Sequence, residues 1–205
     1  MQTATEAEEH LRVIRSLMEK ATIYRAVSAP TALAGGIAGV IVGTAPVQGF
    51  FNQHFPGTSF QIRWLLALFV TLAINGLLIL REAQRRGDPV VSPGMRTAFR
   101  ALLPPVLCGG VFFALLPGTY VPAFLAIFYG LGLLATAHFA PKSIAWLGWS
   151  FLVAGLVTFI FSLLTNRLPG GLTPDLTMLA TFGGFHFIYA ACTWPRRASS
   201  ARGTP

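Results

Sequence analysis

Six long apolar stretches carry charged residues only at their borders, and this feature limits the fold more than any other. They occupy residues 29–46, 63–80, 98–116, 121–138, 143–164 and 175–193. A helix needs about 20 mostly apolar residues to cross a bilayer. Charged residues make up 11% of the chain and hydrophobic residues 54%, whereas a soluble domain carries about 25% charged residues. The sequence therefore predicts an all-α integral membrane protein, built as a six-transmembrane-helix bundle over residues 29–193.

The positions of the basic residues predict how these spans are oriented. With six spans, all of the fifteen lysines and arginines except Arg63 and Arg167 fall on the side that holds both termini. Positive charge accumulates on the cytoplasmic side because it resists translocation. We therefore expect a protein of the cytoplasmic membrane with both termini in the cytoplasm. The net charge of +8 follows from this topology, so nucleic acid is not an expected partner.

Residues 1–28, before the first span, are expected to be cytoplasmic. Thr5 and Glu8 have the spacing of a helix capping box, and apolar residues then recur every three to four positions. This pattern predicts an amphipathic helix over residues 5–27, which either binds a partner or the membrane surface, or packs beneath the bundle. At the other end of the chain, residues 194–205 form a basic cytoplasmic tail.

Two connections between the spans have distinctive compositions. Residues 47–62 combine four phenylalanines with Pro56 and Gly57. Since aromatic residues suit the bilayer interface, they predict an interfacial loop, with a cavity-capping role as the alternative. Residues 81–96 combine arginines with two prolines and two glycines, which predicts an exposed loop.

Gly35, Gly39 and Gly43 recur at every fourth residue of the first span. This spacing leaves a smooth groove on one helix face, along which a neighbouring backbone can approach closely. The neighbour we expect is another helix of the same chain, with a second copy of the chain as the alternative.

Few polar side chains fall near the middle of the spans. His186 lies about as far into the sixth span as Asn75 lies into the second. Because these two spans run in the same direction, we expect both residues at one depth, with Tyr129 of the fourth span near that level. A cluster of the three has two interpretations. It binds a small polar solute or relays a proton, since histidine titrates near neutrality, or it is a hydrogen-bonded packing contact between helices.

Other chemistries find less support in the sequence. His138 and His186 invite a bis-histidine haem site, but their depths differ by about 6 Å at 1.5 Å per residue. No acidic residue lies mid-span, so paired carboxylates and acidic metal ligands are not expected. Cys108 and Cys192 lie in apolar stretches and are interpreted as small packing residues. We therefore expect no cofactor, no metal and no enzymatic activity.

The expected function is that of a non-enzymatic multi-pass membrane protein that acts through association or sensing. The expected partners are the lipid bilayer and either a cytoplasmic protein or a second copy of the chain. The alternative is a small-solute transporter or channel with a polar path around His186, Asn75 and Tyr129. Transport ranks second because coupled transport usually needs a buried charge, and the interiors of the spans carry none.

Overall fold

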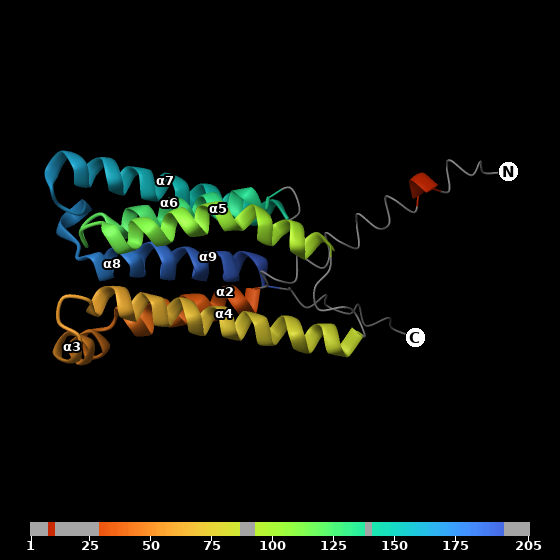
Figure 1. Cartoon of the computed structure of the whole chain (residues 1–205), viewed down its shortest axis with the longest axis horizontal. Coiled ribbons are helices and arrows are strands. Elements are labelled where there is room, and N and C mark those ends of the chain that lie inside the picture. Colours follow the sequence, from red (N-terminus) through yellow and green to blue (C-terminus); the bar gives the residue numbers. More distant parts are fainter. Residues whose placement is uncertain (1–7, 11–28, 87–92, 138–140, 195–205) are drawn as a thin grey trace, which may run out of the picture.

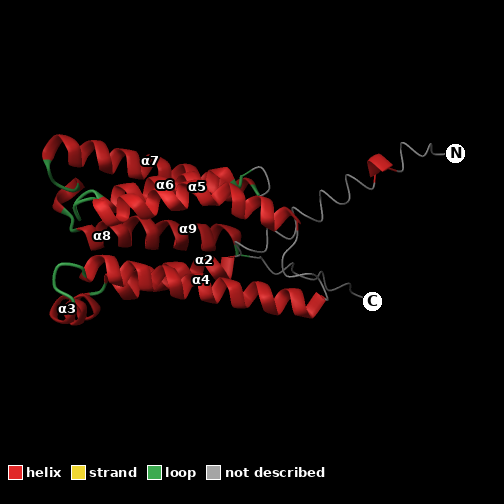
Figure 2. Cartoon of the chain, viewed as in Figure 1, coloured by secondary structure: helices red, strands yellow, loops and turns green. Residues whose placement is uncertain are grey.

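The computed structural model describes residues 8–10, 29–86, 93–137 and 141–194, and all regular structure in these residues is helical (Figure 1, Figure 2). The elements are, in chain order, α2 (Ala29–Gly43), α3 (Ala45–His54), α4 (Ser59–Arg86), α5 (Pro93–Leu115), α6 (Val121–Ala135), α7 (Lys142–Thr165), the 3-10 turn η1 (Pro169–Gly171), α8 (Pro174–Met178), the π-helical turn η2 (Leu179–Gly183) and α9 (Gly184–Thr193). The last three follow one another without a break, and we call them the C-terminal rod. The prediction of an all-helical chain is confirmed for the described residues.

Four helical segments are long and apolar enough to cross a membrane, namely residues 60–78 of α4, residues 95–115 of α5, α7 and the C-terminal rod. The pair α2 and α3 meets the same requirement only as a broken span, because the two helices are bent by 61° where they meet. α6 is apolar but shorter, since its 15 residues extend about 22 Å against a hydrocarbon core of about 30 Å. These four to five candidate spans indicate a membrane protein.

The first span is not the single helix predicted over residues 29–46. α2 ends at Gly43 and α3 begins at Ala45 in a new direction. Pro46 lies in the first turn of α3, where a proline fits, but in a continuation of α2 its ring would clash with the carbonyl of Val42. Of the interfacial loop predicted over residues 47–62, α3 occupies residues 47–54 and α4 occupies residues 59–62, so the prediction of a loop is wrong for these residues.

The loop predicted over residues 81–96 is helical at both ends. α4 continues beyond the predicted span to Arg86, and α5 begins at Pro93. A proline suits the start of a helix because the first N–H groups have no partner within the helix. The arginines of this connection therefore lie in polar helical turns that continue the two apolar helices.

Two predicted segments fall mostly outside the described residues. Of the amphipathic helix over residues 5–27, only Glu8, Glu9 and His10 are described, and they are helical and exposed. Of the basic tail over residues 194–205, only Trp194 is described. His138, considered above as a haem ligand, is likewise outside the described residues.

The helices pack in two groups that the C-terminal rod holds together. α5, α6 and α7 pack in chain order, while α2 packs against α4 and against the rod (Figure 1). The rod in turn contacts α7 and α6. The start of α2 and the end of α9 lie at the same end of the molecule, and α3 lies at the opposite end (Figure 1).

α6 and α7 approach closely at glycines that the sequence analysis did not single out. A Cβ atom on Gly130 of α6 would lie 2.7 Å from the Gly148 carbonyl oxygen of α7, and one on Gly155 would lie 2.8 Å from the Ala123 carbonyl oxygen of α6. Neither position leaves room for a methyl group, so the two backbones meet directly. Gly148 and Gly155 are seven residues apart, which places them on one face of α7.

The two cysteines are free and exposed on the helix surfaces. The interpretation of Cys108 and Cys192 as packing residues is therefore wrong. Cys108 has an exposed apolar neighbour in Leu107, which is 59% exposed. A thiol behaves as a small hydrophobic group, so it suits a surface of this kind as well as an interior.

Candidate functional site

His186 and Tyr129 form a polar contact in the interior of the protein. His186 belongs to the first turn of α9 and is 5% exposed. Its Nε2 atom lies 2.9 Å from the Tyr129 hydroxyl of α6, and its Nδ1 atom lies 2.7 Å from the Phe182 carbonyl oxygen. A carbonyl oxygen can only accept, so Nδ1 carries the proton and donates it. In the neutral ring Nε2 is then the acceptor, and the Tyr129 hydroxyl donates to it.

The imidazole of His186 is surrounded by aromatic rings. The ring centroid of Phe182 lies 4.4 Å away, and the centroids of Phe151 and Tyr129 each lie 5.6 Å away. On the fourth side the ring packs against Gly35 of α2, where a Cβ atom would be in ordinary contact at 3.6 Å from His186 Cδ2. Helices α2, α6 and α7 thus all meet His186, and both of its nitrogens are hydrogen-bonded within the protein.

Asn75 is not hydrogen-bonded to this pair. Its Oδ1 atom accepts a hydrogen bond of 3.3 Å from the Thr31 hydroxyl of α2. The residue of α4 that packs beside Gly35, next to His186, is Thr71, one helical turn earlier. The structure therefore brings together His186 and Tyr129 of the predicted cluster, and it uses Asn75 to join α4 to α2.

The predicted glycine groove faces the C-terminal rod of the same chain. Cβ atoms on the three glycines would lie 3.6 Å from His186 Cδ2 for Gly35, 3.6 Å from the Gly183 Cα for Gly39 and 2.9 Å from a Leu179 methyl carbon for Gly43. At Gly39 the two backbones pass each other with space for a methyl group and no more. The groove thus seats the turn of the rod that carries His186.

A buried ion pair at the α3 end of the bundle was missed by the sequence analysis. Arg63 of α4 is 2% exposed, and its Nη2 atom donates to the Asp175 Oδ2 atom of α8 over 2.7 Å. The indole N–H of Trp64 donates to the other carboxylate oxygen over 3.0 Å. The sequence analysis placed Arg63 on the side opposite the termini and did not predict that its charge is buried. The signal that could have found the pair is that Arg63 and Asp175 begin two predicted spans of the same direction.

The position of Asp175 follows from the local sequence. Thr173 is the N-cap of α8, and its hydroxyl accepts the Leu176 N–H. Asp175 then lies in the first helical turn, where the helix dipole stabilises a negative charge. Arg63 is less well satisfied, since no hydrogen-bond acceptor among the described residues serves its Nε and Nη1 atoms. The pair is thus closely packed but leaves donors of the guanidinium unused.

Neither a metal site among the described residues nor a similarity to known proteins indicates a function. Within the described residues, no group of three or more histidine, cysteine, aspartate or glutamate side chains is arranged to hold a metal ion. No protein-family model, curated protein or solved structure matches the chain. Proposals about function therefore rest on the geometry of the helices and their polar contacts.

Proposed function

We propose that the chain is a six-span protein of the cytoplasmic membrane, with both termini in the cytoplasm, that acts without catalysis through association or sensing. Its amphipathic N-terminal segment is the proposed contact to a cytoplasmic partner or to the membrane surface. Six spans require that the bent pair α2 and α3 and the short helix α6 both cross the bilayer. The shared end of α2 and α9 (Figure 1) supports an even number of crossings.

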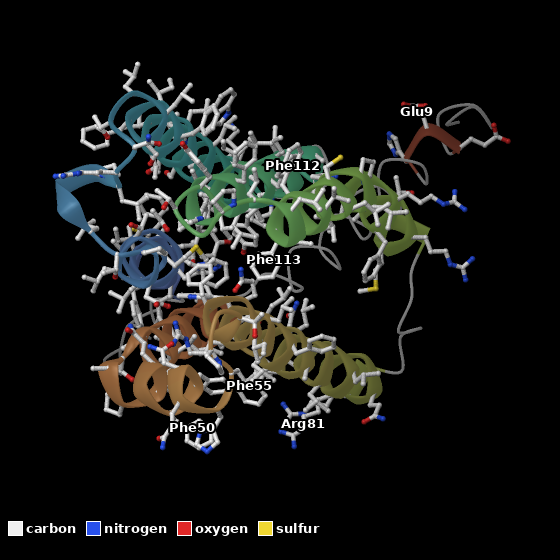
Figure 3. The ribbon with its side chains drawn as sticks, turned by 60° about the vertical axis from the view of Figure 1, so that its left-hand side comes forward. Glu9, Phe50, Phe55, Arg81, Phe112 and Phe113 are labelled. Atoms are coloured by element: carbon white, nitrogen blue, oxygen red, sulfur yellow. The ribbon has the colours of Figure 1, made fainter. Side chains whose placement is uncertain are left out.

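The distribution of exposed charge supports the orientation. Exposed arginines lie at the end of α4 and the start of α5, including Arg81 (Figure 3), Arg85, Arg96 and Arg100. At the opposite end Arg63 is neutralised by Asp175, which leaves Arg167 as the exposed basic residue there among those described. Exposed arginines are thus more numerous at the end where α4 finishes and α5 begins, and this asymmetry favours a cytoplasmic location for that end.

Cysteine labelling in sealed vesicles or cells tests this topology. In a background where Cys108 and Cys192 are replaced by alanine, Thr58→Cys should react with an impermeant thiol reagent applied outside. Gln84→Cys is the matched control, because it is also exposed and should react only after the membrane is permeabilised. The reverse pattern would contradict the proposed orientation, and labelling of both from outside would contradict the number of crossings.

The hydrogen bonding of His186 is the observation that favours association over transport as the function. Both ring nitrogens are hydrogen-bonded to groups of the protein, and aromatic rings pack around the imidazole. A hydrogen bond of this kind joins transmembrane helices with about 0.6 kcal/mol on average. His186 and Tyr129, two of the three side chains that a polar path would need, thus hold α6 and α9 together.

Transport remains the second candidate, and the buried Arg63–Asp175 pair is the observation that favours it. Ionisable residues buried in a membrane protein commonly mark an ion or substrate path. The unused guanidinium donors of Arg63 would have an acceptor if such a solute reached them. Transport ranked second in the sequence analysis because coupled transport usually needs a buried charge. The Arg63–Asp175 pair supplies such a charge.

Two variants of His186 separate these candidates. If the residue only joins helices, His186→Gln should leave the proton permeability of reconstituted vesicles unchanged, as measured with an enclosed pH-sensitive dye. His186→Leu should lower the free energy of unfolding by about 1–3 kcal/mol, because the buried Tyr129 hydroxyl loses its acceptor. In cells, deletion of residues 1–27 should preserve folding and remove cross-linking to cytoplasmic proteins. Proton flux that depends on His186, with unchanged cross-linking after the deletion, would replace association by transport.

A further inference from the structure

A cavity of about 250 Å³ lies between α4, α5, α6 and the first part of the C-terminal rod. Its walls include Trp64 and Leu68 of α4, Gly110 and Phe113 of α5, Tyr129 of α6 and Phe182 of η2. Figure 3 shows Phe113 on the side of α5 that faces α4. Its neighbour Phe112 instead stacks on Phe124 and Phe128 of α6. The cavity thus separates α4 from the group formed by α5, α6 and α7.

The polar groups of the cavity wall are already hydrogen-bonded to the protein. Trp64 donates its indole N–H to Asp175, Tyr129 bonds to His186, and the Thr181 hydroxyl donates to the Thr177 carbonyl. The remaining wall is aliphatic, aromatic or glycine. Water needs two to four polar partners, whereas an apolar cavity of about 150 Å³ stays dry and binds benzene. The cavity therefore suits a hydrocarbon ligand.

The rim of the cavity is continuous with the apolar outer surface of the helices. Leu65 and Leu68 of α4 and Val106 of α5 line it while being 43%, 45% and 60% exposed. In a membrane protein such a rim faces acyl chains, which are the most abundant apolar molecules available to it. Gly110 of α5 leaves open space in this wall, because a Cβ atom built there would have no neighbour within 4 Å.

We propose that this cavity binds a hydrocarbon chain of a bilayer lipid, which enters sideways between α4 and α5. The volume accommodates part of one chain, so the headgroup stays outside the protein. In the proposed orientation the cavity occupies the outer half of the bilayer, since Trp64 lies near the start of α4 and Phe113 near the end of α5. The proposal rests on the membrane location, which its test measures separately.

Trp64 is a built-in reporter for this site. It lines the cavity but is only 5% exposed, whereas Trp146, Trp149 and Trp194 are at least half exposed. A variant with these three replaced by phenylalanine retains Trp64 alone. Reconstituted in vesicles of phosphatidylcholine with brominated acyl chains, it should lose most of the fluorescence that it shows in unbrominated vesicles, because a chain in the cavity brings bromine against the indole.

Filling the cavity should reverse this loss. In the same single-tryptophan background, Gly110→Leu should restore most of the fluorescence and Gly110→Ala part of it. Gly76→Leu is the matched control, since Gly76 also has open space around its Cβ position but does not line the cavity, and its quenching should equal that of the parent.

Co-flotation of the single-tryptophan protein with the vesicles measures the membrane location. Failure to float would contradict the membrane location and the lipid site together. Flotation without quenching of Trp64 would overturn the lipid site alone. Equal quenching in the parent and in both Gly110 variants would also overturn it, because bulk lipid around the protein would then account for the signal.

Discussion

Asp175→Ala should lower the free energy of unfolding by about 3–5 kcal/mol, which is the usual cost of removing one partner of a buried ion pair. Arg63 is 2% exposed, and the carboxylate of Asp175 is its hydrogen-bonded partner over 2.7 Å. Removing the carboxylate leaves the guanidinium buried and uncompensated, and it also removes the acceptor of the Trp64 indole. Unfolding by increasing SDS in mixed micelles measures the loss.

The double variant Arg63→Met with Asp175→Leu is the informative comparison. Replacement of both charges by apolar side chains of similar size is often neutral or stabilising, so the double variant should recover most of the lost stability. Arg167→Met is the matched control, because Arg167 is an exposed arginine at the same end of the molecule and its loss should change stability little. If Asp175→Ala were no more harmful than Arg167→Met, the buried pair would be disproved.

Gly130→Ala should destabilise the protein by about 1–3 kcal/mol, the usual range for overpacking. The added methyl group would lie 2.7 Å from the Gly148 carbonyl oxygen and from the Leu152 backbone nitrogen. Backbone atoms cannot move aside as a flexible side chain can, so α6 and α7 must separate. The same SDS titration measures this effect, and Gly155→Ala should behave alike because its methyl group would lie 2.8 Å from α6 backbone atoms.

Two other glycines supply the controls. Gly76→Ala should be neutral or stabilising by up to about 1 kcal/mol, since it adds no contact within 4 Å and alanine is the better helix former. Gly39→Ala should also be tolerated at 3.6 Å from Gly183, whereas Gly39→Leu should cost more than about 2 kcal/mol. Equal effects of alanine at Gly130 and Gly76 would show that α6 and α7 are not in backbone contact.

The candidate site was predicted in part. His186 and Tyr129 were identified because polar side chains are rare in apolar stretches, so each one stands out from its neighbours. Asn75 was identified by the same criterion, yet it bonds to Thr31. Residue counting along a helix gives depth to about one turn, and one turn separates Asn75 from Thr71, which packs near His186. Which polar residues meet depends on the rotation of each helix about its axis. The local sequence does not determine that rotation.

Hydropathy and charge are properties of short segments, so the amino-acid sequence was enough to locate most of the apolar helices and the charged residues at their borders. α7 matches its predicted span within one residue at each end. Where helices bend or continue was not predicted, since Pro46 divides the first span and α4 extends to Arg86.

Two contacts could be found only from the packed helices. Arg63 reaches Asp175, 112 residues away, and α6 and α7 touch through glycine backbones. Both contacts depend on which helix faces lie against each other. A charge at the start of a span looks the same in sequence whether it faces water or a partner. Likewise, a glycine in an apolar helix looks the same in sequence whether its Cβ position faces open space or a carbonyl oxygen of a neighbouring helix. Packing distinguishes these cases because burial and distance arise only when all the helices are assembled.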